Sequence, residues 1–407
     1  MILHSDANCF YASVEMVEHP EYRNKKIAVC GDTEQRHGIV LTANYPAKHM
    51  GVKTGMANWQ ALQVCPDLTI VHPHYELYLK YSKMLQKIYK QYSDRVESFG
   101  MDECWIDLPF SEEESIQTAQ KIQQQVNEET GLTVSIGVSF SKALAKLGSD
   151  MKKPNGLTIL LRSDFKEKCW HLPASDLLYV GPSTTKKLCQ LGILTIGDLA
   201  TAPESVIAQK LGKNGLMVQS FANGADCFPV APKDYRPEPK SFGHGATCVH
   251  DLNDNYSVWL ALYDLAQDVS HRLIAFERKT RSVNLYVRDN TLSCRSYHIL
   301  LDYPTQSPLI IAQTAYELFC QNYNWDNPVR ALTVAADRLQ DEYIPEQLDI
   351  FDHYVQRDKR NRVDKAIDEI RNRFGINTIR PGCFVNADLC LATDKCETVT
   401  MPGMVFR

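Results

Sequence analysis

Short apolar runs separated by helical patterns mark the first part of the chain. Five runs are apolar, or alternate between apolar and polar positions as strands do: residues 1–3, 27–29, 39–42, 104–108 and 134–138. Residues 75–92 carry apolar side chains at helical spacing, and the Gln-rich residues 115–128 are expected to form a polar helix. This order predicts a mixed α/β region up to about Leu161.

Glycine and proline divide the next part of the chain. Residues 164–226 read as short helices broken at glycines such as Gly181, Gly192 and Gly212, which predicts a small all-helical unit. Residues 229–240 contain four prolines and few apolar side chains, so they predict an extended linker and a domain boundary.

Beyond the linker the pattern predicts an α+β unit of about 100 residues. Helices are expected at 257–276 and 308–321, and strands at 281–288, 292–300 and 329–335. In the tail, apolar residues from Val363 to Phe374 recur at helical spacing before Gly375, which predicts an amphipathic helix.

Composition narrows the class of protein. With 407 residues, 44% hydrophobic and 23% charged, the chain reads as a globular protein of about two to four domains. We expect a cytoplasmic protein, since the sequence has no apolar run of about 18 residues and no signal-like N-terminus. The net charge of −5 argues weakly against a nucleic-acid partner, although binding depends on where the basic groups lie.

The thirteen cysteines are expected to be reduced, because their number is odd and none forms a C-x-x-C pair. Cys383, Cys390 and Cys396 cluster near the end without the spacing of a zinc site.

Three acids are the main candidates for chemistry. Asp6 ends the opening apolar run, and the adjacent Asp102 and Glu103 precede the run at 104–108. If two strands bring them together, their mutual repulsion makes a site for divalent cations. Taken singly, each is more often a solvated surface charge.

The segment after Asp6 predicts a tight turn that enters a helix. Such a turn presents backbone N–H groups to a phosphate. Taken alone, the segment is better explained as a surface acid followed by core aromatics, and Phe10 is expected to pack in the core.

Further motifs along the chain point to one protein family. The three acids are accompanied by residues 42–48 (Thr-Ala-Asn-Tyr-Pro-Ala-Lys), 135–138 (Ser-Ile-Gly-Val), 142–146 (Lys-Ala-Leu-Ala-Lys) and 153–156 (Lys-Pro-Asn-Gly). Their order and spacing resemble the Y-family, the lesion-bypass DNA polymerases typified by bacterial SOS enzymes. The resemblance extends from Met1 to about Leu339, and Lys48, Gly100 and the tail suggest the SOS or mobile-element UV-damage-repair polymerases of Gram-positive bacteria.

The resemblance implies an α+β multidomain fold, a right-hand polymerase. Its expected parts are a ferredoxin-like palm (1–11 and 72–163), small fingers (12–71), a helix-hairpin-helix thumb (164–228), a linker (229–240), an α+β little finger (241–340) and a tail (341–407). The implied activity is low-fidelity translesion synthesis by nucleotidyl transfer, within the SOS response to DNA damage. Too little chain remains for a proofreading exonuclease.

The resemblance also assigns roles in catalysis. Two Mg²⁺ ions would be held by Asp6, Asp102, Glu103 and the carbonyl of Ala7. Neighbouring residues on a regular strand face opposite sides, so Asp102 and Glu103 can converge only at an irregularity, which Gly100 would supply in place of the family's usual serine.

Nucleotide binding is implied for residues on both sides of the acids. Triphosphate contacts are expected from Thr42, Tyr45, Lys48, Lys153 and the backbone N–H groups of Asn8, Cys9, Phe10 and Tyr11. Lys48 stands where most relatives have arginine, so phosphate alignment is expected to be looser. Tyr11 would act as a steric gate that excludes a ribose 2′-hydroxyl.

The remaining implied contacts concern primer-template DNA and a sliding clamp. In the thumb, the implied DNA contacts are Gly181, Ser183 (usually glycine in the family) and Thr184. In the little finger, the implied DNA contacts are Lys240, Ser241, Arg281, Arg288, Arg295 and Arg330. Residues 347–351 resemble a clamp-binding peptide with Gln347, Leu348, Ile350 and Phe351 as anchors. We expect a monomer associated with the nucleoid and no membrane contact.

Two other classes remain open from the sequence. One is a non-catalytic DNA-binding or clamp-recruited accessory protein that keeps the fold. The other is a different two-metal enzyme on a similar palm, such as a nuclease or a nucleotide cyclase.

Overall fold

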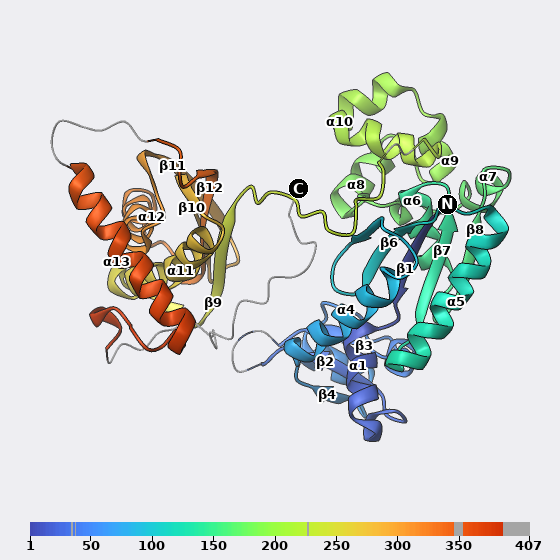
Figure 1. The fold of residues 1–407 in the computed structure, drawn as a ribbon, viewed down its shortest axis with the longest axis horizontal. Helices are drawn as coiled ribbons and strands as arrows, with labels where there is room; N and C mark the ends of the chain where they lie inside the picture. Colours follow the sequence, from blue (N-terminus) through green and yellow to red (C-terminus); the bar gives the residue numbers. More distant parts are fainter. Residues whose placement is uncertain (34–35, 37, 226–227, 346–352, 386–407) are drawn as a thin grey trace. The chain divides into compact units, whose positions relative to one another are not determined.

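The computed structural model describes residues 1–33, 36, 38–225, 228–345 and 353–385 (Figure 1). The chain divides into two compact units between Arg236 and Pro237, within the proline-rich segment. The first unit contains residues 1–31 and 39–236, and the second contains the described residues after Arg236 together with those between 32 and 38. Within these described ranges, no helix combines the length and apolar character that crossing a bilayer requires.

A five-stranded sheet with the order β5-β6-β1-β7-β8 forms the centre of the first unit. Its strands are β1 (Ile2–Ala7), β5 (Val96–Ser98), β6 (Glu103–Asp107), β7 (Val134–Ser139) and β8 (Leu157–Leu160). The central strand β1 pairs antiparallel with both β6 and β7. Because helices cover both faces, the central strands are almost entirely buried, and this is why continuous apolar runs predict them.

Two long helices, α4 (Tyr75–Tyr89) and α5 (Glu112–Thr130), share one hydrophobic core with one face of this sheet. Ser111 caps α5: its hydroxyl accepts a hydrogen bond from the Glu114 N–H, and the Glu114 carboxylate accepts one from the Ser111 N–H. The helix ends at Gly131, whose φ of 70° suits glycine.

Gly137 lets α6 (Lys142–Met151) lie directly against the other face of the sheet. A Cβ atom at Gly137 would lie 2.0 Å from the carbonyl oxygen of Ala145, well inside any real contact. Gly137 pairs with His4 on β1, so α6 occupies the face that also carries Asp6. The sheet and α6 therefore bring Lys146 to the same face as the acids.

A smaller sheet with the order β3-β2-β4 lies within residues 12–71. Its elements are β2 (Ile27–Cys30), β3 (Val40–Ala43), β4 (Thr69–Val71), α2 (Tyr45–His49), α3 (Asn58–Val64) and the 3₁₀ turn η1 (Pro20–Tyr22). It has a core of its own that includes Val40, Ala47 and Ala61. Helix α1 (Phe10–Glu18) instead buries Phe10 and Val14 in the core of the larger sheet, so Phe10 packs in the core as the sequence predicts.

Short helices come after β8, as the glycine pattern predicts. They are α7 (Phe165–Cys169), η2 (Ala174–Asp176), α8 (Pro182–Gln190), α9 (Ile196–Thr201) and α10 (Glu204–Ala222). Their core includes Leu188, Leu199 and Val218 and continues to Leu144 and Leu147 of α6.

The second unit contains a four-stranded antiparallel sheet with the order β11-β10-β12-β9. The strands are β9 (Phe242–Leu252), β10 (Arg278–Asp289), β11 (Cys294–Thr305) and β12 (Val329–Asp341). Helices α11 (Asn255–Ala275) and α12 (Pro308–Asn322) share a core with one face of the sheet. Helix α13 (His353–Phe374) and the turn η3 (Gly382–Phe384) come last, and α13 packs against α11.

The predicted α/β, helical and α+β segments are confirmed in this order. The main differences are β9, which the sequence did not predict, and α13, which begins ten residues before the predicted apolar repeat.

Candidate active site

Asp6 and Glu103 lie opposite each other on neighbouring strands. They are register partners on β1 and β6, and the two-residue period puts them on the face that also carries His4 and Trp105. Asp6 is 5% exposed. The sequence prediction that two strands bring these acids together is confirmed for this pair.

Asp102 joins them through a bend in the chain. Residues 100–102 form the bend, and Gly100 has a φ of 90°, which favours glycine. The Ala7 N–H donates to the carbonyl oxygen of Asp102 at 3.0 Å, so the bend is tied to the end of β1. The irregularity expected at Gly100 is therefore present, and Asp6, Asp102 and Glu103 form what we call the acid cluster.

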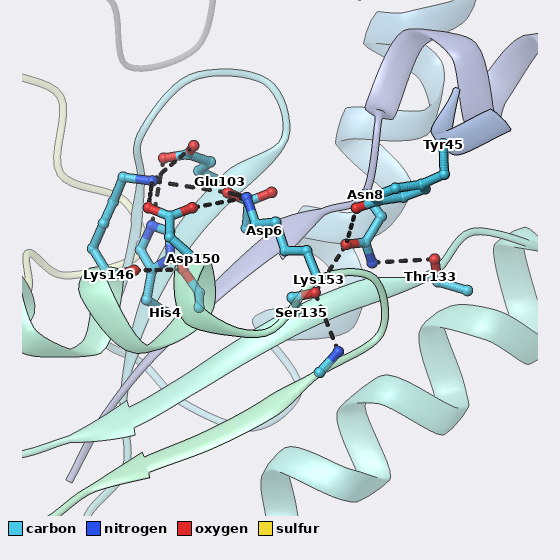
Figure 2. A network of polar contacts seen from close by, with 12 residues as sticks. His4, Asp6, Asn8, Tyr45, Glu103, Thr133, Ser135, Lys146, Asp150 and Lys153 are labelled. Carbon is cyan, nitrogen blue, oxygen red and sulfur yellow. Dashed lines mark hydrogen bonds and ion pairs between the residues drawn. The ribbon is translucent and has the colours of Figure 1, made fainter. Parts of the chain in front are cut away.

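Two lysines lie beside Asp6 and Glu103, as Figure 2 shows. The Lys153 ammonium is 2.8 Å from Asp6 Oδ2, and that of Lys146 is 3.0 Å from Glu103 Oε1 and 3.8 Å from Asp6 Oδ2. Asp150 contacts both ammonium groups, at 3.3 Å from Lys146 and 2.8 Å from Lys153. Burial alone would lower the pKa of each amine, but the surrounding acids outweigh it and raise both.

The three acids of the cluster differ in pKa. Burial raises the pKa of Asp6 to about 7 although Lys153 opposes the shift, and burial with the nearby Glu103 raises the pKa of Asp102 to about 6. For Glu103, burial is outweighed by His4 and Lys146, which lower its pKa to about 2. The acid cluster thus contains two carboxylates that gain from additional positive charge.

The residues present fit a hard divalent cation. Among the residues that the structure describes, no three acidic, histidine or cysteine side chains converge into a ready-made metal group, and the two lysines lie between the acids. The donors are nonetheless oxygens, which Mg²⁺ prefers. Glu103 Oε2 is also buried without a hydrogen-bond partner; His4 Nε2 lies 3.5 Å away, longer than an ordinary hydrogen bond.

Tyr11 lies on α1 with its ring held by other aromatic rings. It stacks on Tyr78 at 4.3 Å between ring centres and 14° between planes, and it meets Tyr75 edge-on at 6.1 Å. Its hydroxyl donates to the sulfur of Met101 at 3.6 Å, next to Asp102 in the chain. The gate proposed from the sequence therefore borders the acid cluster.

The turn that starts α1 has the expected geometry with one exception. Cys9 caps the helix in the left-handed region at φ 47°, and the first N–H groups of the helix have no partner within it. Asn8 differs, because its N–H continues the strand ladder and donates to the Thr133 carbonyl at 2.9 Å. The prediction that the Asn8 N–H meets a phosphate is wrong for this reason.

The other expected triphosphate contacts come from two places. Tyr45 begins α2, and the Lys48 ammonium lies 5.3 Å from the centre of its ring. The Tyr45 hydroxyl donates to Asn8 Oδ1 at 3.2 Å, and burial raises the pKa of Tyr45, which keeps that hydroxyl protonated. Thr42 is half-buried on β3, and Lys153 reaches Asp6 from beyond α6.

The helical segment contains the predicted turn–helix arrangement. Gly181 is the N-cap of α8, and Ser183 and Thr184 lie in its first turn, with Gly181 and Ser183 exposed. First-turn N–H groups have no partners within the helix, so this end of α8 offers backbone donors.

Arginines of the second unit are divided between the two faces of its sheet. Arg288 pairs with Cys294, and its Nε donates to the sulfur of that residue at 3.4 Å. Arg295 pairs instead with Val287, whose side chain is buried in the core beneath the helices, and its guanidinium lies 5.9 Å from the ring centre of Tyr323, just after α12. Basic side chains on neighbouring strands can line one face toward DNA, but the register puts Arg288 and Arg295 on opposite faces, so these two do not share one.

The other predicted contacts of this unit differ in setting. Arg281 is exposed and donates to the carbonyls of Leu301 and Asp302 at 3.3 and 3.1 Å. Arg330 is half-buried at an irregularity of β12, and Lys240 and Ser241 are exposed just before β9. The anchors Gln347, Leu348, Ile350 and Phe351 lie outside the described residues.

Sequence reasoning missed a role for Lys146. It belongs to a recognised motif, and the i, i+4 spacing of Lys142, Lys146 and Asp150 predicts one helical face, but only the pairing of α6 with the sheet reveals its contact with Glu103. Ser135 was likewise part of a motif without a role; its hydroxyl donates to Asn8 Oδ1 at 2.8 Å.

Models of one protein family match two long parts of the chain. The impB/mucB/samB family model matches residues 5–150, and the model of that family's C-terminal domain matches residues 239–350. The DNA polymerase IV of Acetivibrio thermocellus is 44% identical over 94% of this chain and 96% of that protein. The DNA polymerase IV 1 of Bacillus subtilis is 36% identical over 94% of this chain and 92% of that protein.

Among solved structures, a Y-family DNA polymerase chimera of Dbh and Dpo4 superposes with a TM-score of 0.75 at 24% identity, covering 84% of this chain and 99% of that one. The fold is that of a right-hand polymerase. With the identity to curated relatives over nearly its full length, the chain belongs to the Y-family of DNA polymerases.

Proposed function

We propose that the protein is a template-directed DNA polymerase that inserts nucleotides opposite damaged bases, with low fidelity and without proofreading. The observation that carries the proposal is the acid cluster at the end of the palm sheet, flanked by Lys146 and Lys153, in a member of the Y-family. The small sheet of residues 12–71, which we assign to the fingers, has three short strands. Small fingers exclude less of a distorted base pair, which favours lesion tolerance over fidelity.

Running-start primer extension past a defined template lesion tests this function. With Mg²⁺ and all four dNTPs, we expect products longer than the distance to an abasic site, and none when the template is omitted. Without dNTPs the primer should keep its length, because no exonuclease is expected. Products that stop at the lesion in every sequence context would contradict the bypass function.

We assign the acid cluster to two Mg²⁺ ions, held by Asp6, Asp102, Glu103 and the carbonyl oxygen of Ala7. When bound, the ions supply activation of the primer 3′-hydroxyl and neutralisation of the triphosphate. The raised pKa of Asp6 and Asp102 supports the assignment, since buried acids of this kind are stabilised by added positive charge. The Lys153 ammonium contacts Asp6 at this proposed metal site, and we propose that it binds the triphosphate.

Nucleotide selection is proposed to involve three groups of residues. Cys9, Phe10 and Tyr11 offer N–H groups at the start of α1, and Tyr45 and Lys48 lie together on α2, with Thr42 on β3. Lys48 is a point charge and lacks the two-pronged geometry of arginine, so its phosphate contact is expected to be less directional. Tyr11 is proposed to exclude ribose from the sugar site.

Primer-template DNA is proposed to bind without sequence reading, through backbone groups and basic side chains. In the thumb, Gly181, Ser183 and Thr184 offer the start of α8 to a phosphate. In the little finger we retain Lys240, Ser241, Arg281, Arg288 and Arg330 and exclude Arg295. A DNA substrate also implies action at the nucleoid, and we propose that the protein acts as a monomer.

Residues 347–351 are proposed to bind a sliding clamp. Deleting these five residues should reduce synthesis in the presence of a loaded clamp and leave distributive synthesis without the clamp unchanged. Product length on a long primed template, with and without the clamp, measures clamp-dependent and distributive synthesis. Equal loss in the two assays would indicate damage to the fold and contradict a specific clamp contact.

A further inference from the structure

The side chain of Asn8 lies at the end of β1 and forms hydrogen bonds in three directions (Figure 2). Its Nδ2 donates to Thr133 Oγ1 at 3.1 Å, while its Oδ1 accepts from Ser135 Oγ at 2.8 Å and from the Tyr45 hydroxyl at 3.2 Å. Asn8 is 2% exposed and Ser135 is fully buried, while Thr133 and Tyr45 are half-buried. Buried polar networks of this kind are strong only when every member is satisfied.

Ser135 links this network to a second turn. It is fully buried on β7, in register with Asp6, and its Oγ accepts from the Gly156 N–H at 3.2 Å. The hydroxyl has one proton, which it gives to Asn8, so its lone pair is available to Gly156. A single hydroxyl therefore joins the turn that begins α1 to the turn at residues 153–156.

Both turns carry groups that the proposed function assigns to the triphosphate. The first offers the N–H groups that start α1, and the second begins with Lys153, whose ammonium lies 2.8 Å from Asp6. Their separation decides whether both can reach one triphosphate at once. Nothing in the sequence spacing sets this separation, since the two turns lie more than a hundred residues apart.

We propose that Ser135 is a positioning residue for nucleotide binding, which sets the distance between the start of α1 and the 153–156 turn through Asn8. The inference rests on the proposed function, because it requires both turns to contact the triphosphate. Preorganised donors bind a charged ligand more tightly than donors that must first be ordered.

The expected effect is restricted to the triphosphate. Tyr11 is held by Tyr78, Tyr75 and Met101, and none of these forms a contact with Ser135 or Asn8 among the described interactions. Loss of the Ser135 hydroxyl should therefore weaken the binding of all four dNTPs equally and leave the preference for deoxyribose unchanged.

Ser135→Ala, with Ser139→Ala as the matched control, tests the inference. Both serines are fully buried on β7 and face the same side, but the Ser139 hydroxyl donates to the Leu160 carbonyl at 2.9 Å, away from the site. Affinity for dNTP is measured on a primer-template with a dideoxy-terminated primer, and KM and kcat on an extendable one. Thermal melting reports the fold of each variant.

We expect Ser135→Ala to raise the Kd and KM for dNTP roughly tenfold, the effect of one lost buried hydrogen bond, with a much smaller change in kcat. Ser139→Ala should lower the melting temperature similarly and leave Kd unchanged. An equal Kd for both variants, a loss confined to kcat, or a changed sugar preference would overturn the inference. If Ser135→Ala does not fold, Ser135→Cys keeps the volume with a weaker donor and should give the same direction of change.

A parallel pair of variants separates this inference from the proposed function. Lys153→Gln and Lys48→Gln test the triphosphate assignment directly, and unchanged dNTP affinity in both would refute that assignment. If these two variants bind dNTP more weakly and Ser135→Ala binds it as the native protein does, only the role of Ser135 is refuted. Because Ser135 acts through the 153–156 turn, the double variant Ser135→Ala with Lys153→Gln should lose less affinity than the sum of the single losses.

Discussion

Replacing Asp102 and Glu103 together by alanine should abolish primer extension and leave binding of primer-template DNA intact. The two substitutions remove two of the three carboxylates of the acid cluster, and Asp6 remains with Lys153 as its partner at 2.8 Å. Loss of a bound dication removes several kcal/mol of transition-state stabilisation, so we expect the rate to fall by more than about a thousandfold. Single-nucleotide insertion measures the rate, and a DNA mobility shift measures binding.

The matched control for this variant is Glu128→Ala with Glu129→Ala. These adjacent acids are exposed at the end of α5, so the change in charge is the same while the acid cluster is untouched. The control should extend primers at the rate of the native protein. Equal activity of the acid-cluster variant and this control would refute the metal assignment and favour an accessory protein that merely keeps the fold.

A second measurement on the same variant does not depend on activity. A ligand that binds the folded state raises its thermal stability in proportion to the logarithm of the ratio of ligand concentration to Kd, once the ligand is in excess. Mg²⁺ together with dNTP should therefore raise the melting temperature of the native protein and of the Glu128→Ala, Glu129→Ala control. The same addition should raise the melting temperature of the Asp102→Ala, Glu103→Ala variant much less.

Tyr11→Ala should admit ribonucleotides while deoxynucleotide insertion continues. The ring of Tyr11 is fixed by stacking on Tyr78 at 4.3 Å, so it cannot yield readily to a 2′-hydroxyl. Selection of this kind works by a clash against the wrong substrate. We expect the ratio of kcat/KM for dNTP over rNTP to fall by about a hundredfold or more, which corresponds to about 2.7 kcal/mol.

Tyr11→Phe is the control, because it keeps the ring and removes only the hydroxyl, whose contact is the Met101 sulfur at 3.6 Å. This variant should select deoxynucleotides as the native protein does. Single insertions of matched dNTP and rNTP opposite the same template base measure both variants. An unchanged ratio in Tyr11→Ala would show that another group excludes the ribose.

Local patterns predict most elements of this fold, and the predicted strands lie within a few residues of the observed ones, but β9 and the short strands β4, β5 and β8 were not predicted. Runs such as 104–108 and 134–138 are recognisable because strands covered on both faces select apolar residues throughout. Helix α13 was found only in its second half, since its first half is rich in charged residues and shows no apolar stripe.

What the sequence does not predict is the pairing between distant elements. Lys153 and Asp6 are 147 positions apart, and no local pattern indicates that an ammonium group lies beside that acid. The placement of Arg288 and Arg295 on opposite faces was not predictable for a related reason: a shift of one residue in register moves a side chain to the opposite face, and the turn between β10 and β11 decides the register. Motif order located the acid cluster, but the contacts within it depend on packing.

Lys146 and Lys153 are tethered counterions for the acid cluster. Under the proposed metal assignment, a free cation would have to displace these ammonium groups from the carboxylates. A triphosphate bound at the same site would offer Lys153 a new anionic partner in exchange for Asp6. The arrangement would therefore favour binding of metal and nucleotide together over binding of metal alone.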